Sequence, residues 1–269
     1  NASLARQSDS YCGNLSICSG LYRRGIPFYY AGLYFPEDEE FYEEVDIFSR
    51  AVSAIKALKG ARIGQVGVRP NTFETVAYDE VAMINKFGQN VYPINPSDLK
   101  VRFDALQDDE PIVREKVEAI RASVNDVTVA EDYLVNAAKF ELALTEFFVE
   151  NKLSAMAVEC WAAARSLFYI STCSSFGRMT EQGMLTACEV DVMGSLAMLT
   201  QFAAARGEVI PHFIDWTIQH RDTPNWLLAW HCGNAPASLA ADPSRSALRS
   251  RRNMTGTDEV TEGDLSAGL

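Results

Sequence analysis

The alternation of short apolar runs with amphipathic segments is the feature that most constrains the fold of this chain. The runs Ala61–Val68 and Val91–Ile94 have the length and composition of buried strands, and Phe73–Phe87 between them has helical spacing. A helix is predicted over Glu37–Leu58, and a further buried strand over Ile26–Gly32. Strands and helices that alternate with short loops between them predict a parallel sheet, and therefore an α/β fold.

The remainder of the chain adds a helical region and then more strands. Residues 97–150 have helical patterns only, including a long amphipathic helix over Val129–Phe148. After Pro236 the chain is rich in Ser, Ala, Asp, Arg and Gly, which predicts a loop or a poorly ordered tail. Between these regions we expect strands over Leu153–Glu159 and Met184–Glu189, a helix over Val192–Arg206, and strands over Val209–Trp216 and Trp226–His231.

Charge and cysteine usage exclude several classes of function. The 269 residues include 24 Lys and Arg against 36 Asp and Glu, a net charge of −12, which disfavours nucleic acid and anionic membranes as partners. We see neither a membrane-spanning run nor a secretory segment, so we expect a cytoplasmic protein. The six cysteines are scattered and form no CxxC pair, which favours reduced, packed thiols over a disulfide scaffold or a structural zinc site.

Polar side chains follow three of the predicted strands at the point where each strand ends. Glu159 follows the first, Glu189 and Asp191 the second, and His231 the third. Ligands bind outside the carboxyl ends of strands in open α/β sheets, and carboxylates with a histidine suit Mn²⁺ or Mg²⁺. Each residue also has a structural interpretation: Glu159 as a solvated loop residue, Asp191 as the N-cap of the helix from Val192, and His231 as a packed histidine.

Two other chemistries have weaker support. Cys160 and Cys188 flank the carboxylates, but no histidine is close in sequence, so nucleophilic catalysis by either thiol is disfavoured. The run Gly64–Gly67 follows a strand without completing a GxGxxG motif, so dinucleotide binding is disfavoured as well.

Four segments in order resemble the L-fucose isomerase and L-arabinose isomerase superfamily. They are Ala61–Leu99; Ala157–Trp161 (AVECW); Arg178–Met198, which contains the CExD core; and Ile214–Pro236, which runs from IDW to WHCGNAP. The resemblance as a whole spans roughly residues 20–240. The resemblance implies Rossmann-like parallel-sheet domains followed by the start of a mixed α/β C-terminal domain.

The resemblance also implies a function, a metal-dependent ketol isomerase that interconverts an aldose and a ketose through an enediol. By resemblance, Mn²⁺ or another divalent cation is the cofactor, two acidic side chains move the proton between C1 and C2, and both also bind the metal. Glu159 matches the first carboxylate, and Asp191 or alternatively Glu189 the second. His231 matches a metal ligand or a substrate-binding histidine. The residues assigned to substrate binding are Trp161, Glu189, Asp215 and Asn234. The alternative is a sugar-binding or regulatory α/β protein without catalysis.

Domain organisation and assembly follow from the same resemblance. We expect residues 1–59 to end a first Rossmann-like domain, 60–175 to form a second, and 176–269 to form part of a C-terminal domain. Members of the superfamily are longer, so the chain is expected to be a fragment or to lack segments. They also assemble as trimers or hexamers, which predicts a homo-oligomer that acts on a monosaccharide.

Overall fold

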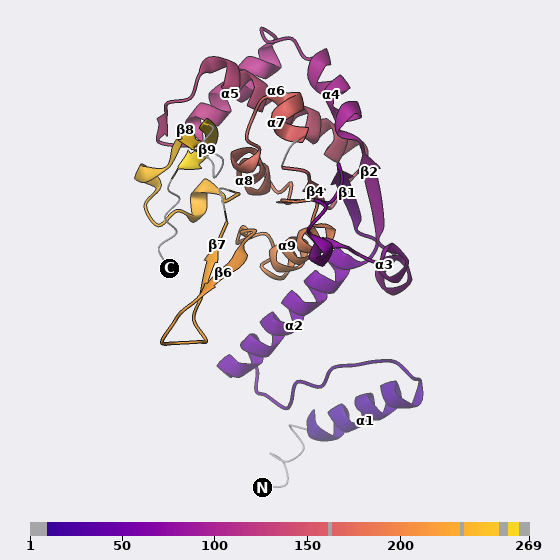
Figure 1. Cartoon of the computed structure of the whole chain (residues 1–269). Coiled ribbons are helices and arrows are strands. Elements are labelled where there is room, and N and C mark those ends of the chain that lie inside the picture. The colour runs from indigo at the N-terminus through magenta and orange to yellow at the C-terminus, as the bar shows by residue number, and fades with distance from the viewer. Residues whose placement is uncertain (1–9, 161–162, 232–233, 253–257, 264–269) are drawn as a thin grey trace. The chain divides into compact units, whose positions relative to one another are not determined.

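The computed structural model describes residues 10–160, 163–231, 234–252 and 258–263 (Figure 1). The chain divides into two compact units, residues 1–51 and 52–269. The domain boundaries inferred from the sequence stay predictions. Among the described residues, no helix is both long enough and apolar enough to cross a membrane.

The first unit contains helix α1 (Ser10–Arg23) and most of helix α2 (Glu39–Leu58), which continues into the second unit. The predicted helix over Glu37–Leu58 is therefore confirmed. The strand predicted over Ile26–Gly32 is wrong, because this segment is irregular and its apolar side chains are exposed. Gly25 and Gly32 have positive φ angles, 65° and 125°, which interrupt an extended backbone at both ends of the segment.

A four-stranded parallel sheet forms the centre of the second unit and confirms the predicted α/β class. The order is β2–β1–β4–β5, and every neighbouring pair is parallel. The strands are β1 (Arg62–Val66), β2 (Asn90–Ile94), β4 (Ala155–Val158) and β5 (Thr186–Ala187). All four residues of β4 are buried and three of the five in β1 are, as expected for strands covered on both faces.

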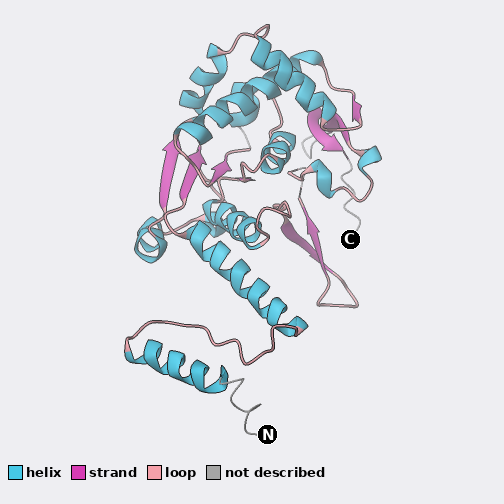
Figure 2. Cartoon of the chain, turned by 180° about the vertical axis from the view of Figure 1, so that it is seen from behind, coloured by secondary structure: helices cyan, strands magenta, loops and turns pink. Residues whose placement is uncertain are grey.

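Helices surround this sheet. Helix α3 (Glu80–Phe87) starts later than predicted, because Asp79 caps it, and a short 3₁₀ turn η1 (Glu74–Val76) precedes the cap. Helix α9 (Val192–Ala204) packs against β1, β4 and β5. Figure 2 shows helices next to the strands of the sheet from behind. The others are α4 (Pro96–Ala105), α5 (Pro111–Ala122), α6 (Glu131–Glu150), α7 (Ala163–Phe168) and α8 (Cys173–Glu181), so the predicted helical character of residues 97–150 is largely confirmed.

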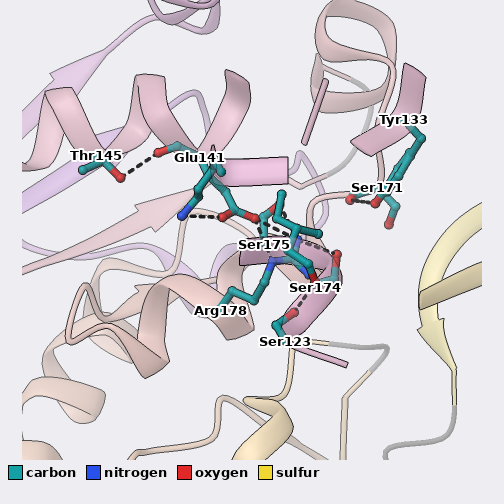
Figure 3. Close-up of polar contacts among 10 residues, drawn as sticks. Ser123, Tyr133, Glu141, Thr145, Ser171, Ser174, Ser175 and Arg178 are labelled. Atoms are coloured by element: carbon teal, nitrogen blue, oxygen red, sulfur yellow. Dashed lines mark hydrogen bonds and ion pairs between the residues drawn. The ribbon is translucent and has the colours of Figure 1, made fainter. Parts of the chain in front are cut away.

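A buried ion pair joins α6 to α8. Glu141 and Arg178 are almost fully buried, and Nε and Nη2 of Arg178 donate to Oε1 of Glu141 at 2.9 and 2.7 Å (Figure 3). Nζ of Lys116, on α5, lies 2.9 Å from the other carboxylate oxygen. Hydroxyls of Ser174 and Ser175 accept from Arg178. Three helices are therefore tied together through one buried carboxylate.

The C-terminal part adds an antiparallel hairpin and a second small sheet. Strands β6 (Asp215–Gln219) and β7 (Leu227–Trp230) form the hairpin, so the strand predicted from Val209 begins only at Asp215. The prediction of an irregular tail is wrong in part. Strand β8 (Ala247–Arg252) pairs with β3 (Asp126–Val127) and with β9 (Asp258–Gly263). The tail also contains the 3₁₀ turns η2 (Ala237–Leu239) and η3 (Pro243–Arg245). Leu248, which is fully buried, explains why this segment is ordered.

Candidate functional site

Glu159 lies at the carboxyl edge of the parallel sheet, directly after β4. Its backbone N–H donates to the carbonyl of Val66 at 2.9 Å, which continues the β1–β4 pairing by one residue. Its Oε2 accepts from the N–H of Val68 at 3.2 Å. A methyl group at Gly67 would lie 2.7 Å from Cβ of Glu159 and closer still to Oε2, so only glycine fits there. The sequence thus builds a glycine turn that holds this carboxylate at the sheet edge.

Glu189 follows the neighbouring strand β5 in a strained backbone conformation. Glu189 and Val190 have φ angles of 60° and 58°, a left-handed conformation that is rare for a β-branched residue such as Val190. The N–H of Val190 donates to the carbonyl of Val158, and that of Asp191 to the carbonyl of Cys188, which hold the turn in place. Strain of this kind is concentrated at functional sites.

The β6–β7 hairpin brings two further groups to Glu189. Its register places Asp215 opposite Trp230, so Asp215 lies beside His231, the residue that follows β7. One ligand atom from each of Glu189, Asp215 and His231 lies within 4.8 Å of the other two. His231 is buried and meets the ring of Phe213 edge to face, with centroids 5.4 Å apart. We call these three residues the carboxylate–histidine cluster.

The electrostatics of this cluster suit a cation. Burial, and then the nearby charges of Asp215 and Asp191, raise the pKa of Glu189 to about 7. Two neighbouring carboxylates therefore disfavour the ionised form of Glu189 unless positive charge is present. Two carboxylates with one imidazole are also a donor set for Mn²⁺ or Mg²⁺, so the residues fit the divalent cation that the sequence predicts.

Asp191 occupies the N-cap position of α9, which is the structural role predicted for it from the sequence. Its Oδ1 accepts from the N–H of Gly194 at 2.7 Å, which makes it the N-cap of α9. Burial raises its pKa, and hydrogen bonds from the backbone of Gly194 and Met193 oppose that shift. A side chain at Gly194 would collide with Asp191 and Phe213.

The structure thus brings together only some of the predicted site residues. Glu189, Asp215 and His231 converge, whereas Glu159 and Asp191 are outside that cluster. Asn234 is buried, with an Nδ2 that makes no hydrogen bond within the described chain. Trp161 lies outside the described residues. None of these positions tests a role, so the assigned roles stay predictions.

His212 is a residue that the sequence analysis missed. Burial, and then the charge of the nearby His231, lower its pKa, which favours the neutral form of its ring. Its Nε2 is buried and has no hydrogen-bond partner among the described residues. The three-residue spacing from His212 to Asp215 was the only signal available, and it does not indicate a shared site.

Two thiols also lie close to Glu189. Sγ of Cys160, Sγ of Cys188 and a carboxylate oxygen of Glu189 lie within 4.8 Å of one another. A hydrogen bond to Cys160, and then burial, raise the pKa of Cys188 well above its ordinary value. A protonated, buried thiol is a poor nucleophile, which agrees with the interpretation of the sequence.

The fold and the cluster define an α/β protein with a cation-compatible site at the carboxyl edge of a parallel sheet. The family model for the N-terminal domain of fucose/sulfoquinovose isomerases matches residues 1–59. A sulfoquinovose isomerase of Alkalicoccus urumqiensis is 27% identical over 209 residues, 77% of this chain and 46% of the relative. Another, from Priestia aryabhattai, is 26% identical over 215 residues, 79% of this chain and 46% of the relative.

A third sulfoquinovose isomerase, from a Clostridium species (strain MSTE9), is 23% identical over 207 residues, 76% of this chain and 45% of the relative. The chain spans about half the length of the curated relatives that it matches. Both kinds of comparison confirm the predicted resemblance to the fucose isomerase-like superfamily.

Proposed function

We propose that this protein is an aldose–ketose isomerase whose site is the carboxylate–histidine cluster. The observation that carries the proposal is the convergence of Glu189, Asp215 and His231 from two separate parts of the fold. The named relatives support a sugar as substrate, and sulfoquinovose is the first sugar to test. A divalent cation such as Mn²⁺ held by these residues would polarise the carbonyl oxygen of an open-chain sugar.

The chain's own residues supply the proton transfer. Glu189 is the first candidate for this transfer, because its carboxylate lies in the cluster where the carbonyl group of the sugar would be held. Glu159 is the second candidate, held at the same sheet edge by Gly67 and Val68. Asp215 lies at the start of an exposed hairpin strand and is accessible to a sugar hydroxyl. Burial of His231 against Phe213 fixes the orientation of its ring.

The experiment that tests this proposal measures isomerisation directly. The full chain, stripped of metal and then supplied with Mn²⁺, is incubated with sulfoquinovose, L-fucose or L-arabinose, and the ketose is followed by NMR. We expect conversion of at least one sugar, a loss of at least about 10²-fold in Glu189→Gln, and much smaller losses in Asp191→Asn. A parent protein that binds sugar but converts none, with or without Mn²⁺, would support a sugar-binding protein instead.

Assembly and location are part of the same proposal. By resemblance, the protein forms a homo-oligomer, a trimer or a hexamer, and acts in the cytoplasm. Exposed apolar side chains on α1 and α2 support the first statement, because large apolar surfaces mark contact sites.

A further inference from the structure

Glu189 belongs to two different sets of side chains that could bind a metal. One set is Asp215 and His231, whose oxygen and nitrogen atoms suit hard and borderline cations. The other set is Cys160 and Cys188, whose sulfur atoms suit soft cations. The proposed isomerase reaction uses the first set and leaves the two thiols without a role.

The sheet explains why the two thiols meet. Cys160 comes two residues after β4, and Cys188 comes directly after β5, which pairs in parallel with β4. The pairing of Ala157 with Ala187 fixes this register. Cys188 is fully buried, whereas Cys160 and Glu189 are half-buried and leave an ion a path to the three side chains.

The spacing of the three ligand atoms fits a small cation. Zn–S and Zn–O distances of about 2.0–2.3 Å put the ligands of a tetrahedral zinc roughly 3.3–3.8 Å apart. The two sulfur atoms and a Glu189 oxygen already lie within 4.8 Å of one another, so shifts of about 1 Å would complete such a site. Three protein ligands leave the fourth position of a tetrahedral ion open.

We propose that Cys160, Cys188 and Glu189 form a second metal site, which binds thiophilic divalent cations such as Zn²⁺ or Cd²⁺. Because Glu189 belongs to both clusters, an ion held by the thiols competes for the negative charge of this carboxylate and repels a second cation at Asp215 and His231. Binding at the two clusters is therefore mutually antagonistic, and each cation weakens the other by the same factor. This antagonism rests on the proposed function, whereas the thiol site itself does not.

Cadmium titration tests the thiol site by a signal that needs no catalysis. The full chain is kept reduced with a phosphine, which supplies no competing thiol, and Cd²⁺ is added while the ultraviolet charge-transfer absorption of Cd–thiolate bonds is recorded. We expect saturation at one Cd²⁺ per chain. Absence of this absorption in the parent protein overturns the proposal.

Matched variants assign the signal to this pair of thiols. Cys160→Ser, at a half-buried position, should weaken Cd²⁺ binding at least about tenfold without unfolding the chain, and Glu189→Gln should weaken it as well. Cys18→Ser, on α1, is the control and should bind Cd²⁺ like the parent. An unchanged titration in Cys160→Ser, or an equal loss in Cys18→Ser, overturns the site.

The antagonism has its own measurement. Bound Mn²⁺ is followed by electron paramagnetic resonance while Cd²⁺ is added, and we expect its release in the parent protein and retention in Cys160→Ser. Retention in the parent overturns the antagonism. A protein that binds no Mn²⁺ at all contradicts the proposed function, and the cadmium titration still decides the thiol site.

Discussion

At the residue scale, Glu189 takes part in most of the chemistry that we propose for this protein. Its backbone is strained, its carboxylate belongs to both metal-compatible clusters, and its pKa is raised to about 7. The sequence placed Glu189 at a strand end but could not choose between it and Asp191. Residues two apart on a strand would share a face, whereas the left-handed turn at Glu189 and Val190 separates the two carboxylates. Because neither residue of that turn is glycine, the sequence does not indicate a left-handed conformation there.

The first prediction concerns the pH dependence of stability in the metal-free protein. The pKa of Glu189 rises from 4.5 to about 7 on folding, so between these values the folded chain holds a proton that the unfolded chain releases. Stability therefore falls as pH rises from about 4.5 to about 7. Glu189→Gln should remove this fall and melt higher than the parent at about pH 8, as measured by calorimetry.

The control for this prediction is Glu159→Gln, which removes a negative charge at the same sheet edge. It should keep the pH dependence of the parent. Mn²⁺ should raise the melting temperature of the parent but not of Glu189→Gln, since ligands that bind only the folded state stabilise it. Equal pH profiles for the parent and Glu189→Gln would contradict the assignment.

At the element scale, the turn after β1 decides where Glu159 points. Gly67 has φ +86°, and a Cβ there would collide with the Glu159 side chain. Gly60 has a similar φ of +69° with nothing within 4 Å of its Cβ position. A substitution at Gly60 therefore tests backbone strain alone, whereas a substitution at Gly67 adds a collision with Glu159.

The second prediction follows from this pair of glycines. Gly60→Ala should cost about 1–2 kcal/mol of stability and leave turnover unchanged, because it only strains the backbone. Gly67→Ala should cost more and reduce turnover at least about tenfold, because it displaces Glu159. Denaturant unfolding and steady-state kinetics check both. Normal turnover in a folded Gly67→Ala would remove Glu159 from the reaction.

The third prediction separates the capping role of Asp191 from metal binding. Asp191→Ala should destabilise the protein by about 0.5–2 kcal/mol, whereas Asp191→Asn should cap α9 nearly as well as the parent. Neither variant should change Mn²⁺ affinity more than about threefold if Glu189, Asp215 and His231 are the ligands. Asp79, whose Oδ1 accepts from the N–H of Ala82 at the start of α3, gives matched control variants. A large loss of Mn²⁺ in Asp191→Asn would restore the sequence-based assignment.

At the scale of the whole molecule, the sequence predicted the parallel sheet and most helices, because apolar periodicity is a local property of the chain. It missed features that depend on distant pairing. Strand β8 exists because Asp126–Val127 pairs with it 121 residues away, and Asp215 meets His231 through the register of a hairpin. The segment Ile26–Gly32 was predicted as a strand for the opposite reason. It is an apolar run, but the described part of the chain contains no strand that pairs with it, and the segment is irregular.

The fourth prediction concerns the buried ion pair that joins three helices. Glu141→Gln leaves Arg178 and Lys116 without their carboxylate and should cost about 3–5 kcal/mol. Glu146→Gln, one turn further along α6, breaks only an exposed pair with Arg102 and should cost about 1 kcal/mol or less. Urea unfolding measures both. A cost below about 1 kcal/mol for Glu141→Gln would show that the pair contributes little to stability.

The fifth prediction concerns assembly. Helices α1 and α2 bury none of their described side chains, and Val45, Ile47 and Phe48 are each at least half exposed. Apolar surfaces of this kind are covered in stable proteins, and the superfamily resemblance indicates further copies of the chain. We therefore expect sedimentation equilibrium to give a mass of three or six chains.

Ile47→Asp should lower this mass, because a buried charge disfavours association, whereas Val149→Asp on the exposed face of α6 should not. If the parent protein and Ile47→Asp both sediment as single chains at every concentration, these helices do not mediate self-association.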